Sequence, residues 1–348
     1  MLEGPNGQGK TNFLEACYLA CTLRPLRAQR LSELIRFSAE SAKVTATFAM
    51  RGGDRALEIE ISSGKRAARL DGKPVRDPDE LFNELAVVAF TPDDLSLVRL
   101  GPDGRRRLLD RAVQNRHPAQ LSDARDYLRA LKNRNELLRQ GAPDALREAF
   151  DEPLARSGAR IRLRREAVLR ELNPFAKAAF AQVARGEAQL ALGYHAAGSE
   201  LQPIENESED SLAQRIAKAL QARLSRDRLR GFTSVGPHAN DLLISLGEKP
   251  ARAFASQGQA RAIVLAFKIG EIENLRAQQG RAPLLLLDDV SSELDPERNA
   301  FLMKSLASLA GQVLLTTTDA KHLVASLREA RGEQGDVTLY QVRAGRIA

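Results

Sequence analysis

The chain has 348 residues, of which 43% are hydrophobic and 28% are charged. These proportions are typical of a globular protein and argue against wholesale disorder or a fibrous repeat. The longest strongly apolar run, residues 283–287, is far shorter than the ~20 residues of a membrane-spanning helix. Two cysteines are too few for a disulfide framework, and no basic-then-apolar leader opens the chain, so we expect a cytoplasmic protein with no membrane partner.

The positive charge is concentrated in one segment. The formal net charge is +7, and residues 105–185 alone hold 19 Lys and Arg against 10 Asp and Glu, which leaves the remainder nearly neutral. Such a concentration predicts a surface that neutralises nucleic-acid phosphates, although a solvated helix surface in an arginine-rich proteome has the same pattern. The arginines that we expect at this surface are Arg105, Arg106, Arg107, Arg160, Arg162, Arg164 and Arg165.

A glycine-rich loop lies at the start of the chain. It fits the pattern G-x-x-x-x-G-K-[ST], and the apolar residues after it recur with helical spacing from about Lys10. In such a loop backbone N–H groups surround phosphate at a helix N-terminus, the lysine reaches the β and γ phosphates, and the hydroxyl ligates Mg²⁺. The predicted phosphate-binding residues are Gly4, Pro5, Asn6, Gly7, Gln8, Gly9, Lys10 and Thr11, with Thr11 as the metal ligand.

Further elements follow in chain order. We expect Cys17 and Cys21, on the apolar side of the first helix, to be small buried side chains rather than metal ligands. Alternating residues in 44–48 and 57–61 around Gly52-Gly53 predict a β-hairpin, and residues 85–90 predict a short strand.

The basic segment has helical periodicity. Apolar residues in 121–138 and 154–172 recur every three or four positions, with a break at residues 141–143, which predicts an antiparallel helical pair. The acidic stretch 205–210 predicts a surface loop, and 211–224 predicts a further helix.

A second helix start has the composition of an anion site. Ser256 is a candidate N-cap for a helix over about 260–275, and Gly258 permits close backbone approach to an anion. The residues Ser256, Gln257, Gly258 and Gln259 therefore predict a second phosphate-binding helix start.

An apolar run ends in two carboxylates. Residues 283–287 are typical of a buried parallel strand. At its end Asp288 would hold Mg²⁺, and Asp289 would orient or deprotonate an attacking water.

Together these motifs resemble the ATP-binding-cassette head shared by transporters, SMC proteins and the RecF family. Residues 291–295 belong to the general resemblance to this head. The RecF family is the most similar, in the same order and over nearly the whole chain, through residues 90–95, 105–110, 236–238, 256–259 and 287–289. The resemblance implies an α/β fold: a P-loop ABC-type ATPase head with a mixed sheet and flanking helices, and an inserted α-helical domain. The head would comprise residues 1–105 and 230–348, and the helical arm residues 106–229.

The resemblance also implies a function. Relatives of this kind are bacterial ATPases of recombinational repair and replication-fork maintenance that bind ATP and Mg²⁺ and hydrolyse ATP slowly, as a DNA-dependent switch. The chain would form an ATP-dependent homodimer on gapped DNA, at duplex/single-strand junctions, and help RecO and RecR to load recombinase. Ser256 and Gly258 would contact the ATP held by the partner's P-loop.

Several positions depart from the family pattern. Only Met1–Glu3 precede Gly4 where the family has about two strands, so we expect the strand that positions the loop and a sheet edge to be missing, through start-site assignment rather than natural truncation. The strand over 314–319 lacks the histidine of transporter ATPases, and Thr317 or Thr318 would substitute. We expect Asp93 and Asp94 to couple the helical domain to the site, while His238 is equally consistent with a structural and a functional role.

Other functions were weighed. A transporter ATPase would carry the histidine, and an SMC protein would need hundreds of heptad residues where only about 120 residues separate the two halves of the head. A nuclease of the overcoming-lysogenization type would continue into an acidic metal-binding domain. A non-hydrolysing DNA-binding scaffold stays open as an alternative.

Overall fold

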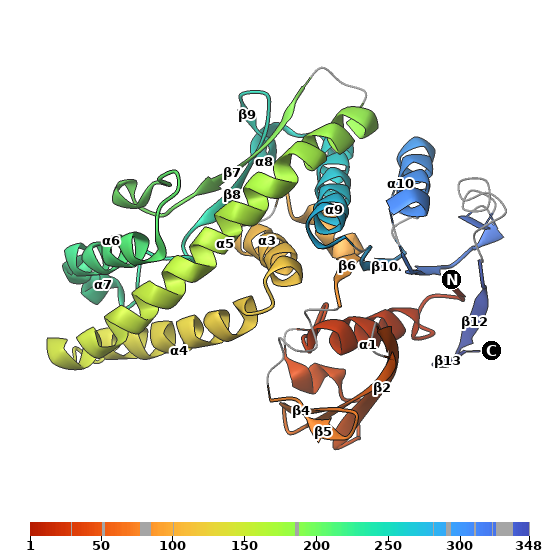
Figure 1. The fold of residues 1–348 in the computed structure, drawn as a ribbon, viewed down its shortest axis with the longest axis horizontal. Helices are drawn as coiled ribbons and strands as arrows, with labels where there is room; N and C mark the ends of the chain where they lie inside the picture. Colours follow the sequence, from red (N-terminus) through yellow and green to blue (C-terminus); the bar gives the residue numbers. More distant parts are fainter. Residues whose placement is uncertain are drawn as a thin grey trace. The chain divides into compact units, whose positions relative to one another are not determined.

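The computed structural model describes residues 1–28, 30–50, 53–76, 85–99, 101–184, 188–280, 282–289, 294–309, 311–321, 323–324 and 337–347 (Figure 1). The chain forms two compact units. Residues 1–95 and 271–348 make the terminal unit, and residues 96–270 make the middle unit. No helix of the described ranges is long and apolar enough to cross a membrane.

The terminal unit is built on a mixed sheet with the strand order β13-β12-β1-β11-β10-β6. All neighbours are parallel except β12 and β13, which are antiparallel. The strands are β1 (Leu2–Glu3), β6 (Val87–Phe90), β10 (Leu284–Asp288), β11 (Val313–Thr317), β12 (Tyr340–Arg343) and β13 (Arg346–Ile347). The predicted fold class and the strands near residues 85–90, 283–288 and 314–319 are confirmed.

The register brings several strand ends to one edge of this sheet. Asp288 pairs with Thr316, Glu3 pairs with Thr317, and Leu287 pairs with Phe90. Because parallel strands share a direction, the segments that follow β1, β6, β10 and β11 all leave from the carboxyl edge. In open α/β sheets this edge is where ligands bind.

Residues 2–3 correct one expectation. The sequence led us to expect that the strand before the P-loop is missing, but Leu2–Glu3 forms β1, inside the sheet between β11 and β12. Leu2 is buried, and Tyr340 N donates to Met1 O over 2.9 Å. Hydrogen bonds from two neighbours and a buried side chain therefore hold a strand of only two residues in place.

Helix α1 (Lys10–Thr22) covers the sheet. Leu14, Tyr18 and Cys21 pack with Val87 and Leu286 in one buried cluster, which is the packing that the apolar spacing of this helix predicts. The helix begins where predicted, at Lys10. Two further helices of this unit are α10 (Pro296–Leu309) and the 3₁₀ helix η1 (Leu31–Leu34).

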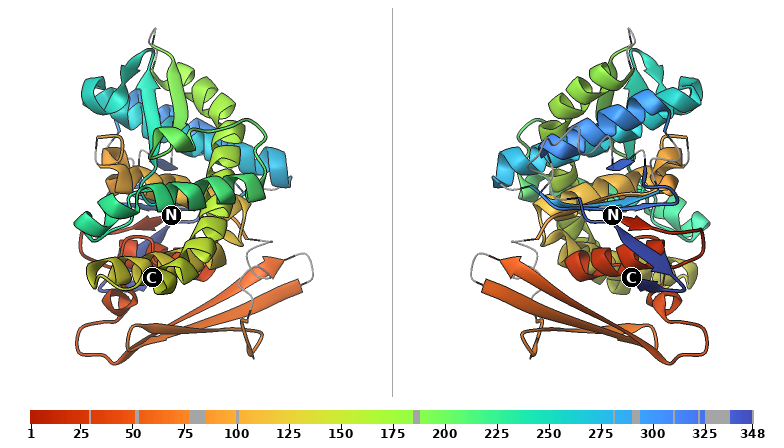
Figure 2. Two further views of the ribbon diagram at one scale, coloured as in Figure 1. Left: turned by 90° about the vertical axis from the view of Figure 1, so that its left-hand side faces the viewer. Right: turned by 90° about the vertical axis from the view of Figure 1, so that its right-hand side faces the viewer.

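A separate antiparallel sheet has the order β2-β3-β4-β5. The predicted hairpin is confirmed as β2 (Ser41–Met50) and β3 (Gly53–Ser62), in which Val44 pairs with Ile59. Strands β4 (Lys65–Leu70) and β5 (Lys73–Pro74) extend it, and Figure 2 shows the long hairpin beside them.

The middle unit is mainly helical. Helices α4 (Gln120–Arg139) and α5 (Asp144–Ala184) pack side by side and confirm the predicted pair, with the break where 141–143 predicts it (Figure 1). Around them lie α3 (Pro102–Arg116), α6 (Glu209–Ala222) and α7 (Leu224–Arg230). Tyr127, Leu154, Ile161, Leu212 and Ile216 form a shared core.

A small sheet completes the middle unit. Its strands are β7 (Leu190–His195), β8 (Asp241–Leu246) and β9 (Lys249–Pro250), followed by α8 (Ala251–Phe254). Helix α9 (Gln257–Gln279) begins in the middle unit and ends in the terminal unit. The predicted domain boundaries at residues 105 and 230 differ from the unit boundaries at 95 and 270, so residues 230–270 are part of the same compact unit as the helices. The division into an ATPase head and a helical arm stays a prediction.

Candidate nucleotide-binding site

The P-loop is a tight turn between β1 and α1. Gly7 and Gly9 have φ angles of 79° and 94°, in the left-handed region that glycine adopts without steric cost. At Gly4 a Cβ atom would collide with the carbonyl oxygen of Val342 in β12. The glycines of the motif are thus required by the turn itself and by the close approach of β12.

Lys10 lies inside this turn. Its side chain is buried, and its Nζ donates to Gly4 O over 2.5 Å and to Pro5 O over 2.9 Å. No carboxylate pairs with it within the described ranges. The ammonium is therefore held over the curve of the loop, where backbone N–H groups and a helix N-terminus favour an anion.

Thr11 and Asp288 meet at the carboxyl edge of the sheet. Thr11 Oγ1 donates to Asp288 Oδ1 over 2.9 Å, although 277 residues separate them in sequence. Asp288 is 4% exposed, so the carboxylate is held at the buried end of β10. A hydroxyl and a carboxylate oxygen side by side are the ligand types that Mg²⁺ prefers.

Thr316 is a part of this site that the sequence reasoning missed. Its Oγ1 donates to Asp288 Oδ1 over 2.9 Å, and it also accepts from Asp289 N over 3.0 Å. The signal was the strand register: a threonine on β11 directly opposite Asp288. The sequence analysis named Thr317 and Thr318 instead. Thr317 Oγ1 donates to Asp319 O over 3.0 Å, and Thr318 is exposed. That either threonine substitutes for the histidine of transporter ATPases stays a prediction.

Asp289 has a left-handed backbone, with φ at 48°. Non-glycine residues rarely adopt this conformation, and where they do the surrounding structure holds them in it. Here Asp289 N donates to both Thr316 O and Thr316 Oγ1, over 3.2 and 3.0 Å. The residue after the metal-ligand candidate is thus fixed by β11, half-buried at the edge of the sheet.

Arg27 is a second residue that sequence reasoning missed. Its Nη1 lies 3.5 Å from Asp288 Oδ2, and its Nε lies 3.5 Å from Asp93 Oδ2. Glu15 of α1 positions the segment, because Glu15 Oε1 accepts from Leu26 N over 2.7 Å. No motif marks Arg27, which is one of several arginines between α1 and β2.

Asp93 and Asp94 belong to the 3₁₀ helix η2 (Pro92–Ser96), directly after β6. Asp93 contacts Arg27 and so approaches the carboxylate cluster, whereas Asp94 is buried and accepts from Thr91 N over 3.0 Å. Asp94 thus shapes the turn after β6. Their predicted role in coupling the helical domain to the site stays a prediction.

The β12–β13 turn braces the P-loop. Gln8 Oε1 accepts from Ala344 N over 2.7 Å, and Gly345 N donates to Gln8 O over 3.0 Å. A Cβ atom at Gly9 would lie 3.3 Å from the Cα of Gly345. The last residues of the chain therefore help to position the first ones.

The Ser256–Gln259 segment starts helix α9 in the middle unit. Gln259 N donates to Ser256 Oγ over 3.1 Å, and Ser256 N donates to Gln259 Oε1 over 2.9 Å. This reciprocal pair is a capping box, so the predicted N-cap is confirmed, although the helix begins at Gln257 rather than near 260. Ser256 and Gln257 are exposed, and the predicted contact of this segment with phosphate stays a prediction. The predicted motif residues Ser291–Glu293 lie outside the described residues.

His238 has a structural environment. Its Nδ1 contacts the Tyr127 hydroxyl, and its Nε2 lies 2.9 Å from Thr233 O. Burial lowers its pKa below the ordinary histidine value. Of the two roles that the sequence left open, the hydrogen-bonded structural one fits this geometry.

The arginine clusters correct our largest expectation. We expected solvated cations, but Arg162 is 1% exposed with Nε on Glu166, and Arg165 is buried with Nε and Nη2 on Asp110. The others are also engaged: Arg160 and Arg164 with Asp123, Arg105 with Asp241, and Arg106 with Asp103 and Asn240 O. Of the seven, only Arg107 is fully exposed.

The physical reason is that Arg160, Arg164 and Arg165 on α5 meet carboxylates of α3 and α4, while Arg162 pairs with Glu166 one turn further along α5 itself. Sequence counts record the charge of a segment, not which cations are already paired. The predicted DNA surface is therefore wrong for the buried Arg162 and Arg165, and it stays a prediction for the half-buried Arg160 and Arg164.

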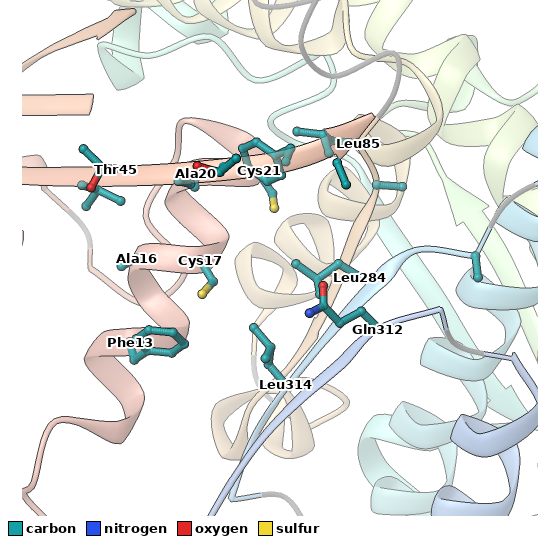
Figure 3. Close-up of a pocket in the computed structure, with 17 residues that line it drawn as sticks. Phe13, Ala16, Cys17, Ala20, Cys21, Thr45, Leu85, Leu284, Gln312 and Leu314 are labelled. Atoms are coloured by element: carbon teal, nitrogen blue, oxygen red, sulfur yellow. The ribbon is translucent and has the colours of Figure 1, made fainter. Parts of the chain in front are cut away.

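A cavity of about 540 Å³ lies beside α1, lined by residues of α1, β2, β10 and β11 (Figure 3). Cys17 and Cys21 face it, and burial raises the pKa of their thiols to about 11 and about 12. Both thiols are thus protonated near neutral pH, and the described residues hold no group of three metal-ligating side chains. The expectation of small buried side chains agrees with the structure for Cys21, whereas Cys17 is half-buried.

Comparisons with known proteins agree with this architecture. The family model described as "RecF/RecN/SMC N terminal domain" matches residues 1–334. The "DNA replication and repair protein RecF" of Myxococcus xanthus (strain DK1622) is 52% identical over 99% of this chain and 90% of the relative. The protein of the same description from Anaeromyxobacter dehalogenans (strain 2CP-C) is 51% identical over 100% of this chain and 92% of its own length.

A solved structure is also similar. It is described as "Structure of the recombination mediator protein RecF-ATPrS in RecFOR pathway", and it aligns with a TM-score of 0.85 and 29% identity over 99% of this chain and 90% of that chain. Its fold matches the fold found here. The chain therefore belongs to the RecF family of DNA replication and repair proteins.

Proposed function

We propose that the chain is an ATP-controlled DNA-binding protein of recombinational repair and replication-fork maintenance, working in the cytoplasm. The observation that carries the proposal is the contact between Thr11 and Asp288, because it joins the P-loop to the acidic strand end. The similar solved protein is described with ATPrS, which supports a nucleotide at this place.

The residues present fit a magnesium nucleotide. Lys10, whose ammonium bonds loop carbonyls and pairs with no carboxylate of the described residues, would hold the β and γ phosphates, while the loop N–H groups surround them. Thr11 Oγ1 and Asp288 Oδ1, 2.9 Å apart, would hold Mg²⁺, which when bound supplies positive charge to the phosphates.

Hydrolysis would be slow and would serve as a switch. Asp289, fixed by Thr316 at the carboxyl edge, would orient a water molecule or accept its proton. Two hydrogen bonds from Asp289 N to Thr316 hold this backbone conformation and so limit the reorganisation that the residue needs. We propose that DNA increases this weak hydrolysis.

ATP would also act as the contact between two copies of the chain. The Ser256–Gln259 helix start is capped by its own side chains and exposed, as a surface that docks on another molecule must be. We propose that it contacts the γ phosphate held by the Lys10 loop of a second copy. A ligand that both copies hold stabilises the dimer by mass action, and its hydrolysis releases the dimer.

The substrate would be gapped DNA, at duplex/single-strand junctions, and the chain would help RecO and RecR to load recombinase there. The relatives described as DNA replication and repair proteins, and the solved protein placed in the RecFOR pathway, support this part.

The experiment measures sedimentation velocity with ATP or ADP, with and without gapped DNA. We expect ATP to convert monomers to dimers, and expect neither Lys10→Ala nor Ser256→Arg to dimerise alone. An equimolar mixture of the two variants should form mixed dimers. Each mixed dimer keeps one of its two composite sites, so the mixture should hold about half as many intact sites as the wild type. If ATP leaves the mass of the wild-type chain unchanged on every DNA, a non-hydrolysing scaffold is the better function.

A further inference from the structure

The cations of α4 differ from the other cations of the middle unit. Arg125 and Arg129 are exposed, and within the ranges that the structure describes neither lies within ion-pair distance of a carboxylate. The arginines of α5 discussed above are held by Asp110, Asp123 and Glu166 instead. Helix α4 therefore presents positive charge that is available to a partner.

These cations share one face of the helix. Positions 125, 129, 132 and 139 differ by four, three and seven residues, so the side chains of Arg125, Arg129, Lys132 and Arg139 form one line, here called the basic stripe. Buried residues on the opposite side, including Tyr127 and Arg134, pack α4 into the middle unit. The stripe therefore faces outward on a helix that its other face anchors.

Negative charge close to the stripe is limited. Glu136 lies on the same face and binds Arg139 Nη2 over 2.7 Å, and Arg139 and Lys132 lower the pKa of its carboxyl. Asp126 is exposed but lies about 100° around the helix from Arg125. Four cations against one carboxylate give the stripe a net positive charge.

The stripe continues beyond α4. A Cβ atom at Gly231 would lie 3.0 Å from Arg139 Cγ, so the end of α7 meets the end of α4. Arg226 and Arg230 are exposed in α7, and Arg230 lies over the Phe232 ring at 6.0 Å. The basic surface thus extends past the tip of the helical pair.

We propose that the basic stripe binds the phosphate backbone of duplex DNA. The proposal rests on the proposed function for the presence of DNA and adds where the duplex is held. Arg125 to Lys132 spans about 10 Å, which corresponds to about three base-pair steps at a rise of 3.4 Å along the duplex axis. Contacts of this kind carry no sequence information, as suits a protein that acts at gaps anywhere in a genome.

The test replaces three cations of the stripe in one variant, R125Q/R129Q/K132Q. A matched control, R170Q/K177Q/K218Q, removes the same charge from exposed residues of α5 and α6 in the same unit. Binding to a fluorescent gapped duplex is measured by anisotropy between 50 and 300 mM salt. Circular dichroism and ATP binding confirm that each full-length variant is folded.

For the stripe variant we expect an affinity loss of tenfold or more, and a salt slope smaller by about 2 to 3 because each phosphate contact contributes about 0.9. The control should bind DNA as the wild type does. R125K/R129K should also retain its affinity for DNA, because binding depends on the positive charge and not on the guanidinium group. Equal binding by the stripe variant and the wild type overturns the proposal. A wild-type chain that binds no DNA overturns the proposed function as well, which separates the two failures.

Leu128 distinguishes DNA from a protein partner. Its side chain is 58% exposed within the stripe. Leu128→Ser should leave DNA affinity within twofold, because phosphate contacts dominate. If only Leu128→Ser impairs assembly with a partner protein, and the stripe variant leaves DNA binding unchanged, the face is a protein-docking surface and the proposal is wrong.

Discussion

Thr11 Oγ1 donates a hydrogen bond of 2.9 Å to Asp288 Oδ1, and this contact joins the first helix of the chain to a strand near its other end. Thr316 donates to the same oxygen from the neighbouring strand. Asp288 thus accepts hydrogen bonds from hydroxyl groups of α1 and β11 at the carboxyl edge of the sheet. The predictions below follow from this arrangement and from the pairing of charges in the middle unit.

Thr11→Ala should weaken nucleotide binding only in the presence of Mg²⁺. The variant loses the hydroxyl that would share the metal with Asp288, while the loop N–H groups and Lys10 remain. Titration calorimetry with and without Mg²⁺ measures this, and we expect a loss of at least tenfold with the metal present. Thr11→Ser keeps the hydroxyl and should behave as the wild type; equal losses in both variants would contradict the assignment.

Asp289→Asn should separate binding from hydrolysis. The amide keeps the size of the side chain but removes the base, so ATP affinity should change by less than threefold while turnover falls at least 100-fold. Phosphate release measures turnover. The matched control is Asp319→Asn, after the next strand, where the exposed side chain should leave turnover unaltered. Comparable turnover in Asp289→Asn and the wild type would exclude Asp289 as the base.

Arg134→Met should strongly destabilise the middle unit. Arg134 is fully buried, and it binds Asp151 over 2.7 Å and Asp227 over 3.3 Å. Without it the buried Asp227 loses the ion pair with Arg134, and Asp151 keeps its ion pair with Arg147; breaking a buried pair costs about 3 to 5 kcal/mol in comparable cases. Urea unfolding measures the loss, and Arg156→Gln, at an exposed ion pair, should show no measurable change. A midpoint for Arg134→Met within error of the wild type would rule out this role.

His238 should make stability depend on pH. Burial lowers its pKa in the folded chain, so between the ordinary histidine value near 6.5 and the lower folded value the unfolded chain binds more protons. Stability from this group is complete above pH 6.5 and is lost as the pH falls. Urea midpoints at pH 7.5 and 5.5 should therefore differ less in His238→Gln than in the wild type. His117, whose pKa burial also lowers, contributes equally to both proteins and cancels.

Much of the head was predictable because each motif carries its own local geometry. The glycines of the P-loop, the helix after it and the apolar strand before Asp288 are all local patterns, and the structure contains each of them. The motifs led us to expect that Thr11 and Asp288 would both hold Mg²⁺, which predicts that they lie close together. Spacing alone could not have placed them 2.9 Å apart.

Residues that depend on tertiary pairing were not predictable. Thr316 reaches Asp288 because of the register of β11 against β10, and Arg27 reaches it because Glu15 holds the preceding turn. The pairing of Arg160 and Arg165 was missed for the same reason, because Asp123 and Asp110 reach them only once the helices pack. The pair of Arg162 with Glu166 lies within α5, and its i,i+4 spacing was visible in the sequence. A count of charges could locate the basic segment, but it could not show which of its cations are exposed and can bind a partner.

The most direct test of the account is titration calorimetry of a non-hydrolysable ATP analogue with Mg²⁺ into the wild type and Lys10→Ala. We predict one nucleotide per wild-type chain and at least a 100-fold loss in the variant, because Lys10 is the ammonium inside the loop. An affinity that is the same in both proteins would contradict the account, since the nucleotide would then be held somewhere other than the loop that joins β1 to α1.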